Sequence, residues 1–296
     1  MDQRPKTGTH GAEDPLAWVT AALPTDKRAV EAFQERVWRF HREHRRPMAW
    51  RDEITPYGVF VSEIMLQQTQ VSRVAEKYPR FIDRFPSFEA LAAASLREVL
   101  EEWSGLGYNR RARFLHEAAR IILAEHDGSL PKDPALLRRL PGIGVNSAGS
   151  IAAFAFNLPV LFLETNIRTV YIFYFFPGEE RVADSRLLLL LEDTLDRRAP
   201  REWYYALMDL GVFLKARVGN LTRKSRSYAT QSPFKGSLRE VRGALLRALT
   251  VDGPISRASL EERLPYEEER LTRALAALEK EGFVAAEDGE TYRIRD

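Results

Sequence analysis

The stretch Leu140–Val170, LPGIGVNSAGSIAAFAFNLPVLFLETNIRTV, decides the fold, because a glycine-rich turn, an apolar run and a carboxylate follow one another in it. Its proline and glycines predict a tight turn with outward-facing backbone amides, and a helix opening near Asn146 adds the positive end of its dipole. Such a turn can bind a phosphate without any basic side chain. The turn residues expected to contact the phosphate are Pro141, Gly142, Ile143 and Gly144.

A carboxylate follows this turn by roughly 20 residues, after a run too apolar for a protein surface. Glu164 stands there, directly before Thr165 and Asn166, which are residues that can cap a helix. At the edge of an apolar core the pKa and reactivity of a carboxylate can be tuned, so Glu164 is a candidate reactive group. The alternative is that Glu164 only caps the helix that begins near Asn166.

Composition limits the class of protein. The chain has 296 residues, 45% of them hydrophobic, without a long uninterrupted apolar span, so we expect a soluble protein of two or three domains and no membrane contact. Residues 1–24 contain no apolar targeting segment, so they predict a disordered tail and a cytoplasmic protein by default. The location that we expect is cytoplasmic and associated with a bacterial or archaeal nucleoid. Because the chain has no cysteine, we expect no disulfide and no iron–sulfur cluster. We expect no other cofactor either.

Helical patterns dominate residues 25–214, so the main body is predicted to be all-α. Thr25 and Asp26 precede an amphipathic run that ends at His44. In the helix after Pro56, a polar row at i, i+4 and i+7 lies beside an apolar stripe, which is typical of a pocket wall or of a solvated face. The row consists of Glu63, Gln67 and Gln70. His41 and His44 are one turn apart, but with no third ligand we expect no metal site.

A basic segment, residues 215–236, follows the main body and is read as a linker without acidic residues. Its phosphate-binding candidates are Lys215, Arg217, Arg223, Lys224 and Arg226, and the alternative is a merely solvated linker. Since the net charge of the whole chain is only +2, any nucleic-acid surface must be a local patch of this kind.

Residues 237–296 predict a winged-helix-like domain. Helices are expected at Leu238–Thr250, Ser256–Leu264 and Glu267–Glu281, followed by a hairpin around Asp288 and Gly289. The third helix opens with three glutamates, which would repel phosphates, so we favour an interdomain or protein-contact role over DNA reading for this domain.

Several ordered blocks resemble the helix-hairpin-helix family of DNA glycosylases, and its MutY-like adenine glycosylases in particular. Besides Leu140–Val170, the blocks are Trp50-Arg51, Pro56-Tyr57, Val61–Val71, Gly105–Tyr108 and Arg111–Arg113. The resemblance spans roughly residues 28–214. It implies two helical lobes around a cleft, with residues 1–27 and the segment after Leu140 in one lobe and about Arg51 to Leu140 in the other. It also implies a monomer that binds double-stranded DNA at a mismatched or damaged base.

The resemblance implies the roles of single residues. Glu63 matches the general acid that protonates adenine, which needs a pKa raised by burial, and Glu164 matches an aspartate that stabilises the sugar cation. Asn146 stands where enzymes that also cleave the strand have a lysine, so a monofunctional enzyme is expected. Lys215 stands where relatives place the first cysteine of an iron–sulfur cluster. The implied base-pocket residues are Gln67, Gln68, Trp50, Arg46, Tyr108, Asn146 and Asn166.

Two other functions remain open. A thymine or uracil mismatch glycosylase is the enzymatic alternative, although pyrimidines leave as stabilised anions and do not need an acid such as Glu63. The other alternative is a lesion-binding protein without catalysis, which the change from aspartate to Glu164 and the missing cluster would explain.

Overall fold

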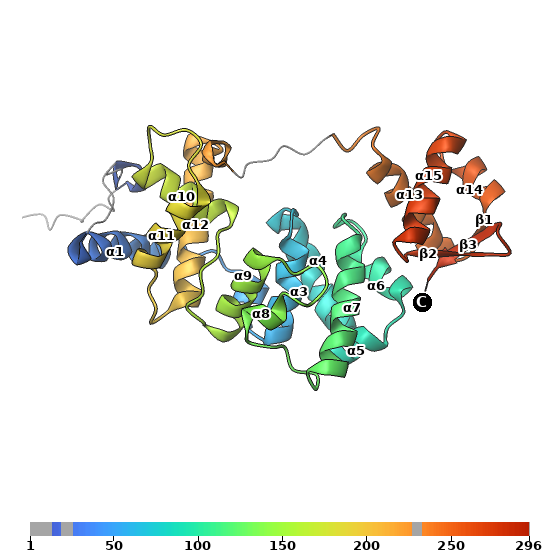
Figure 1. Ribbon diagram of the computed structural model, residues 1–296, viewed down its shortest axis with the longest axis horizontal. Helices are drawn as coiled ribbons and strands as arrows, with labels where there is room; N and C mark the ends of the chain where they lie inside the picture. Colours follow the sequence, from blue (N-terminus) through green and yellow to red (C-terminus); the bar gives the residue numbers. More distant parts are fainter. Residues whose placement is uncertain (1–13, 19–25, 227–232, 296) are drawn as a thin grey trace, which may run out of the picture. The chain divides into compact units, whose positions relative to one another are not determined.

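The computed structural model describes residues 14–18, 26–226 and 233–295, and the fold is mainly α-helical with one small sheet (Figure 1). The chain forms two compact units. One unit comprises Met1–Arg46 and Leu163–Ala229, and the other comprises Pro47–Phe162 and Thr230–Asp296. We call them the terminal-helix unit and the hairpin unit. The chain passes between them three times, so each unit is built from two separate stretches of sequence.

The terminal-helix unit packs four helices around an aromatic core. The helices are α1 (Lys27–His44), α10 (Thr165–Phe175), α11 (Asp184–Thr194) and α12 (Pro200–Val218). As expected, α1 begins after Asp26, whose side chain accepts a hydrogen bond from the Ala29 backbone nitrogen at 2.8 Å. The ring of Phe33 on α1 packs edge-on against Phe175 at 5.1 Å and against Trp203 at 6.2 Å between centroids.

The helical body of the hairpin unit is built from eight helices over residues 49–156. They are α2 (Ala49–Asp52), α3 (Pro56–Leu66), α4 (Val71–Arg84), α5 (Phe88–Ala93), α6 (Leu96–Trp103), α7 (Arg110–Glu125), α8 (Pro134–Leu137) and α9 (Val145–Phe156). Four of the eight begin at a Ser, Thr or Asp, and α6 starts with a capping box in which Ser95 and Glu98 satisfy each other's backbone amides.

The boundary between the units differs from the predicted one. The sequence suggested a division near Leu140, whereas the hairpin and α9 belong to the hairpin unit, whose first stretch ends at Phe162. Packing explains the difference, because α9 lies against α3 and Gly149 of α9 is covered by Phe162. A β-carbon at Gly149 would lie 2.7 Å from the Phe162 Cβ, so only glycine permits this approach.

The C-terminal part of the hairpin unit has winged-helix topology (Figure 1, orange to red). Its elements are α13 (Leu238–Asp252), β1 (Ile255–Ser256), α14 (Arg257–Arg263), α15 (Glu268–Lys280), β2 (Val284–Glu287) and β3 (Thr291–Ile294). The three helices and the hairpin confirm the expected order. The strand β1 was not expected, since two residues give no alternating pattern; it pairs antiparallel with β3, which lies between β1 and β2.

Two further boundaries are corrected. Within the predicted tail, residues 1–13 and 19–24 lie outside the described residues, but Pro15–Trp18 forms a 3-10 turn whose Pro15 carbonyl accepts a hydrogen bond from the Tyr174 hydroxyl at 3.2 Å. The predicted linker begins as helix, because α12 runs to Val218 and ends only at Gly219, with φ +82°. Residues 227–232 of that segment lie outside the described residues.

Candidate nucleic-acid interface and active site

The glycine-rich hairpin forms the expected tight turn in front of α9. Gly142 has φ +76°, and a β-carbon there would also lie 2.8 Å from the Phe114 ring, so both backbone and space require glycine. Ile143 is buried and anchors the turn. Gly144 caps α9 with extended backbone and has no atom within 4 Å of a β-carbon position, while Val145 is 60% exposed. The first turn of α9 is therefore open to a phosphate.

Glu63 and Gln67 connect α3 to the hairpin and its helix. The Ser150 hydroxyl lies 2.5 Å from Glu63 Oε2 and 3.1 Å from the Ser147 carbonyl. Gln67 donates its amide to the Gly142 carbonyl at 3.3 Å and to the Ser147 hydroxyl at 3.1 Å. The candidate acid and the candidate phosphate-binding turn thus belong to one hydrogen-bonded assembly within the hairpin unit.

The Ser150 hydroxyl suits a carboxyl group that gains and loses a proton. A hydroxyl has one proton and two lone pairs. When the carboxylate is ionised, the Ser150 hydroxyl donates a hydrogen bond to Glu63. When the acid is protonated, the hydroxyl can donate to the Ser147 carbonyl instead and accept a hydrogen bond from Glu63. Sequence reasoning missed Ser150, and its only local signal is a polar residue within the apolar run of α9.

The polar row predicted on one helix is interrupted. Helix α3 ends at Leu66, Gln67 is its C-cap, and Gln68 adopts a left-handed conformation with φ +55°. Gln70 instead caps the start of α4, so it does not continue the face that carries Glu63 and Gln67. The prediction of a single helix through Gln70 was wrong.

Arg111 of α7 holds this turn in place. Its guanidinium donates to the carbonyls of Ile64 and Met65 at 2.8 and 2.7 Å, and to the Thr69 hydroxyl at 2.8 Å. It also donates to the Gly107 carbonyl at 3.1 Å. Burial lowers the pKa of Arg111 to about 10, which still leaves it charged at neutral pH. One buried cation therefore ties the end of α3 to the loop before α7.

Tyr108 lies at the tip of that loop. It adopts φ +49°, it is 37% exposed, and the Arg111 guanidinium lies 5.4 Å from its ring centroid. Gln68 and Tyr108 thus both stand on left-handed turns at the surface, which is a position from which side chains can enter opened DNA. Trp50 lies elsewhere, in the core against Tyr78 at 5.5 Å, and its predicted contact with a base stays a prediction.

Glu164 is the N-cap of α10 in the terminal-helix unit. Its Oε1 accepts hydrogen bonds from the backbone nitrogens of Asn166 at 2.8 Å and Ile167 at 3.1 Å. Its Oε2 accepts one from the Asn166 side-chain amide at 3.3 Å. Burial raises the pKa of Glu164 above its usual value, although these three hydrogen bonds favour the ionised form. Glu164 therefore caps α10, and its role in catalysis stays a prediction.

The position of Glu164 depends on a close helix contact. A β-carbon on Gly211 of α12 would lie 2.3 Å from the Asn166 carbonyl oxygen, so α12 touches the backbone at the start of α10. The sequence analysis gave Gly211 no role. Its physical role is that it lets α12 support the turn on which Glu164 and Asn166 stand.

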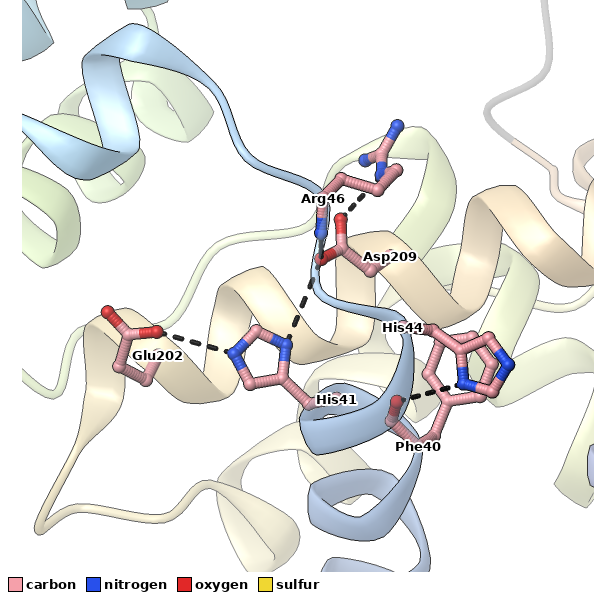
Figure 2. A network of polar contacts seen from close by, with 6 residues as sticks. All are labelled: Phe40, His41, His44, Arg46, Glu202 and Asp209. Atoms are coloured by element: carbon pink, nitrogen blue, oxygen red, sulfur yellow. Dashed lines mark hydrogen bonds and ion pairs between the residues drawn. The ribbon is translucent and has the colours of Figure 1, made fainter. Parts of the chain in front are cut away.

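Arg46 is bound by the buried carboxylate of Asp209 on α12 (Figure 2). Its guanidinium Nε lies 2.7 Å from Asp209 Oδ1, and its backbone nitrogen donates to Oδ2 at 3.2 Å. His41 lies between Asp209 at 3.8 Å and Glu202 at 3.4 Å, whereas His44 stacks on Phe40 at 4.4 Å. The two histidines therefore have different partners, and Asp209 is a site-organising residue that the sequence did not reveal.

The predicted basic segment is mostly exposed in its described part. Lys215, Arg217 and Arg223 are exposed, and Arg217 lies over the Phe213 ring at 4.9 Å. Arg226 is exposed and donates to the Arg181 carbonyl at 2.8 Å. Lys224 is partly neutralised, because its ammonium lies 3.2 Å from a carboxylate oxygen of Glu180. Four of the five predicted cations are thus open to solvent.

The residues of the chain do not fit an iron–sulfur cluster. The chain has no cysteine, and Lys215 is an exposed cation at the end of α12. Among the described residues, no group of three or more acidic or histidine side chains is arranged to hold a metal. No helix of the described part has the length and apolarity to cross a membrane.

Comparisons with known proteins agree with this geometry. Residues 61–224 match the family model of the HhH-GPD superfamily base excision DNA repair protein. The adenine DNA glycosylase of Mycolicibacterium smegmatis is 35% identical over 283 residues, which cover 84% of this chain and 94% of that protein. That of Buchnera aphidicola subsp. Baizongia pistaciae is 34% identical over 206 residues, which cover 66% of this chain but only 58% of that protein.

A solved structure shows the same fold. A thermostable thymine-DNA glycosylase superimposes with a TM-score of 0.55 at 23% sequence identity, and the match covers 62% of this chain and 85% of that chain. The matched family region, residues 61–224, contains the hairpin, Glu63 and Glu164.

Proposed function

We propose that this chain, which belongs to the HhH-GPD superfamily of base excision DNA repair proteins, is a monofunctional DNA glycosylase that releases adenine from a mismatch in duplex DNA. The observation that carries the proposal is the link between Glu63 and the hairpin helix through Ser150. It joins a proton donor to a phosphate-binding turn. The mycobacterial relative is named an adenine DNA glycosylase and matches over most of both chains, which supports adenine as the substrate.

Purine release needs a proton at the base. Adenine leaves poorly as an anion, so a carboxylic acid must protonate a ring nitrogen as the glycosidic bond breaks. In this proposal Glu63 gives that proton, and the Ser150 hydroxyl then stabilises the ionised carboxylate by donating a hydrogen bond to it. Gln67 holds the hairpin beside the acid, and Gln68 and Tyr108 enter the space left by the displaced base.

The sugar develops positive charge while the base leaves. In its ionised form Glu164 supplies the negative charge that stabilises the oxocarbenium-like transition state. Its oxygens are fixed by the first amides of α10, so the carboxylate does not reorganise during the reaction. Water then completes the hydrolysis. Asn146 at the hairpin offers no amine for a covalent intermediate, which supports release of the base without strand cleavage.

The capping role of Glu164 also supports a second candidate function. Because three hydrogen bonds already occupy its carboxylate, Glu164 could serve α10 alone. The protein would then bind lesions without cutting the glycosidic bond. Retained binding to abasic DNA without base release would identify this second function.

Single-turnover base release across a panel of mismatches separates these functions. Glu164→Gln keeps a capping oxygen but removes the charge, so adenine release should fall by roughly a hundredfold to a thousandfold while binding to abasic-site DNA stays near wild type. Glu63→Gln should abolish purine release and spare a pyrimidine that leaves as an anion. Wild-type protein that releases thymine or uracil but no adenine would refute the assignment of Glu63.

Glu164→Asp tests the length of this side chain, because the family that the chain resembles has an aspartate at the matching position. Aspartate also caps helices, so α10 should be retained. A loop adapted to glutamate should lose activity with the shorter acid, since a displacement near 1 Å can cost on the order of a hundredfold. If wild type and both Glu164 variants bind abasic DNA equally and none releases a base, Glu164 is a cap and the lesion-binding function holds.

A further inference from the structure

The winged-helix domain is fixed to the helical body of the hairpin unit. Arg97 of α6 donates to the carbonyls of Thr250 and Val251, at 2.8 and 3.2 Å, at the C-terminal end of α13. Glu281 lies between two cations, with its carboxylate 2.7 Å from Arg110 of α7 and 2.5 Å from Arg242 of α13. These contacts hold α13 beside the loops that carry Gln68 and Tyr108.

An open hollow of about 1250 Å³ runs between α13 and those loops. Its lining on the side of the body includes Gln67, Gln68, Tyr108 and Gly142. Its lining on α13 includes Arg239, Gly243 and Arg247, which recur at helical spacing and so form one stripe. We call this hollow the α13 groove. It is continuous with the residues proposed to enter the DNA and with the hairpin.

The α13 groove is positively charged. Arg73 of α4 and Arg247 of α13 are exposed, and neither has an ion-pair partner among the described residues. Glu101 is the one acidic residue in the described lining. Phe234, 61% exposed, adds an aromatic face at the edge. Exposed arginines beside an aromatic side chain suit a nucleic-acid strand, because phosphates bind the cations and a base can stack on the ring.

Gly243 marks the place where a ligand in the α13 groove can come closest to the backbone of α13. It stands in the middle of α13, where glycine weakens a helix relative to alanine. No atom lies within 4 Å of the position that its β-carbon would occupy, so internal packing among the described residues does not require glycine there. The missing side chain leaves the α13 backbone open to the groove midway between Arg239 and Arg247, as a close approach by a ligand requires.

We propose that α13 is the DNA-binding helix of the winged-helix domain and lies along the phosphate backbone next to the opened base pair. This inference rests on the proposed function and extends it to a surface outside the matched family region. Arg239 and Arg247 are eight residues apart, which is roughly 12 Å along a helix. That distance corresponds to about three to four nucleotides at the rise of one strand.

The third helix of the winged-helix domain, α15, is negatively charged at its start, in contrast to the arginines of α13. Glu267, Glu268 and Glu269 precede or open α15, and Arg257 is paired with Glu268 at 3.3 Å. The domain therefore presents its first helix to DNA and not the third. This role of α13 replaces the interdomain or protein-contact role that the three glutamates of the third helix suggested.

The test compares one arginine on each helix. Arg247→Ala removes a cation of the α13 groove, and Gly243→Glu adds a negative side chain in the open space. Arg273→Ala is the matched control, because Arg273 is an exposed arginine of α15 that does not line the groove. Binding to a duplex with an abasic analogue is measured for the full chain at several salt concentrations, with circular dichroism to verify folding.

Arg247→Ala should weaken binding severalfold and reduce the slope of log affinity against log salt by about 0.9. Gly243→Glu should weaken binding further, and Arg273→Ala should stay within twofold of wild type. Unchanged affinity and slope in both groove variants would overturn the proposal, as would an equal loss in Arg273→Ala.

Wild-type base release is measured in parallel, so the two proposals fail separately. If wild type releases adenine and the groove variants bind like wild type, only the role of α13 falls. If wild type releases no base but the groove variants lose affinity and salt slope, the glycosylase assignment falls and α13 remains a DNA-binding helix. The binding readout does not depend on catalysis.

Discussion

Gly211→Ala tests whether the contact between α12 and α10 positions Glu164. The added β-carbon would lie 2.3 Å from the Asn166 carbonyl oxygen and 2.7 Å from its carbonyl carbon, whereas ordinary contact begins at 3.4 Å. The two segments must therefore separate by about 1 Å, because a packed core has no space to absorb the atom. Overpacking of this kind costs about 1–3 kcal/mol.

The activity should fall more than the stability suggests. The Asn166 backbone nitrogen donates to Glu164 Oε1, so moving Asn166 moves the carboxylate. A displacement near 1 Å at a reacting group reduces the rate on the order of a hundredfold. In a chain of this size the loss of stability lowers the melting temperature by roughly 2–12 °C. Single-turnover adenine release well below that temperature separates misplacement from unfolding.

Gly178→Ala is the matched control in the same unit. Gly178 is exposed, and no atom lies within 4 Å of its β-carbon position, so alanine there should change neither rate nor melting temperature. If Gly211→Ala releases adenine at the wild-type rate and melts at the wild-type temperature, the contact with α12 does not position Glu164 and the argument is refuted.

Two further predictions follow from the terminal-helix unit. Because burial raises the pKa of Glu164, the folded protein keeps the Glu164 proton up to a higher pH than the unfolded chain does. The free energy of unfolding should therefore fall as pH rises from about 4.3 through the raised pKa. Glu164→Gln should remove this pH dependence in urea unfolding. Over the same range adenine release should rise with pH as the carboxylate ionises. Asp209→Asn leaves the partly exposed Arg46 without its buried anionic partner and should lower the free energy of unfolding by about 1–3 kcal/mol. Glu35→Gln, in the exposed pair with Arg42, should lower it little. Equal effects of the two variants in urea unfolding would contradict the role of Asp209.

The sequence by itself determined the elements whose signals are local. The hairpin turn follows from Gly142, whose positive φ favours glycine, and α1 follows from Asp26 and the apolar periodicity behind it. The helix order and hairpin of the winged-helix domain were also readable, because turn residues separate the elements. These features depend on residues within about one or two helical turns of one another.

Tertiary structure decided the features that join distant residues. Asp209 reaches Arg46 across 163 positions and Arg97 reaches Thr250 across 153, and no local pattern identifies such partners. The end of α3 at Leu66 depends on Arg111, which binds the last carbonyls from another helix. Helix α9 joins the hairpin unit because Gly149 admits Phe162 and Ser150 bonds Glu63. A sequence pattern records which face of an element is apolar, whereas shape and hydrogen bonding between elements decide what covers it.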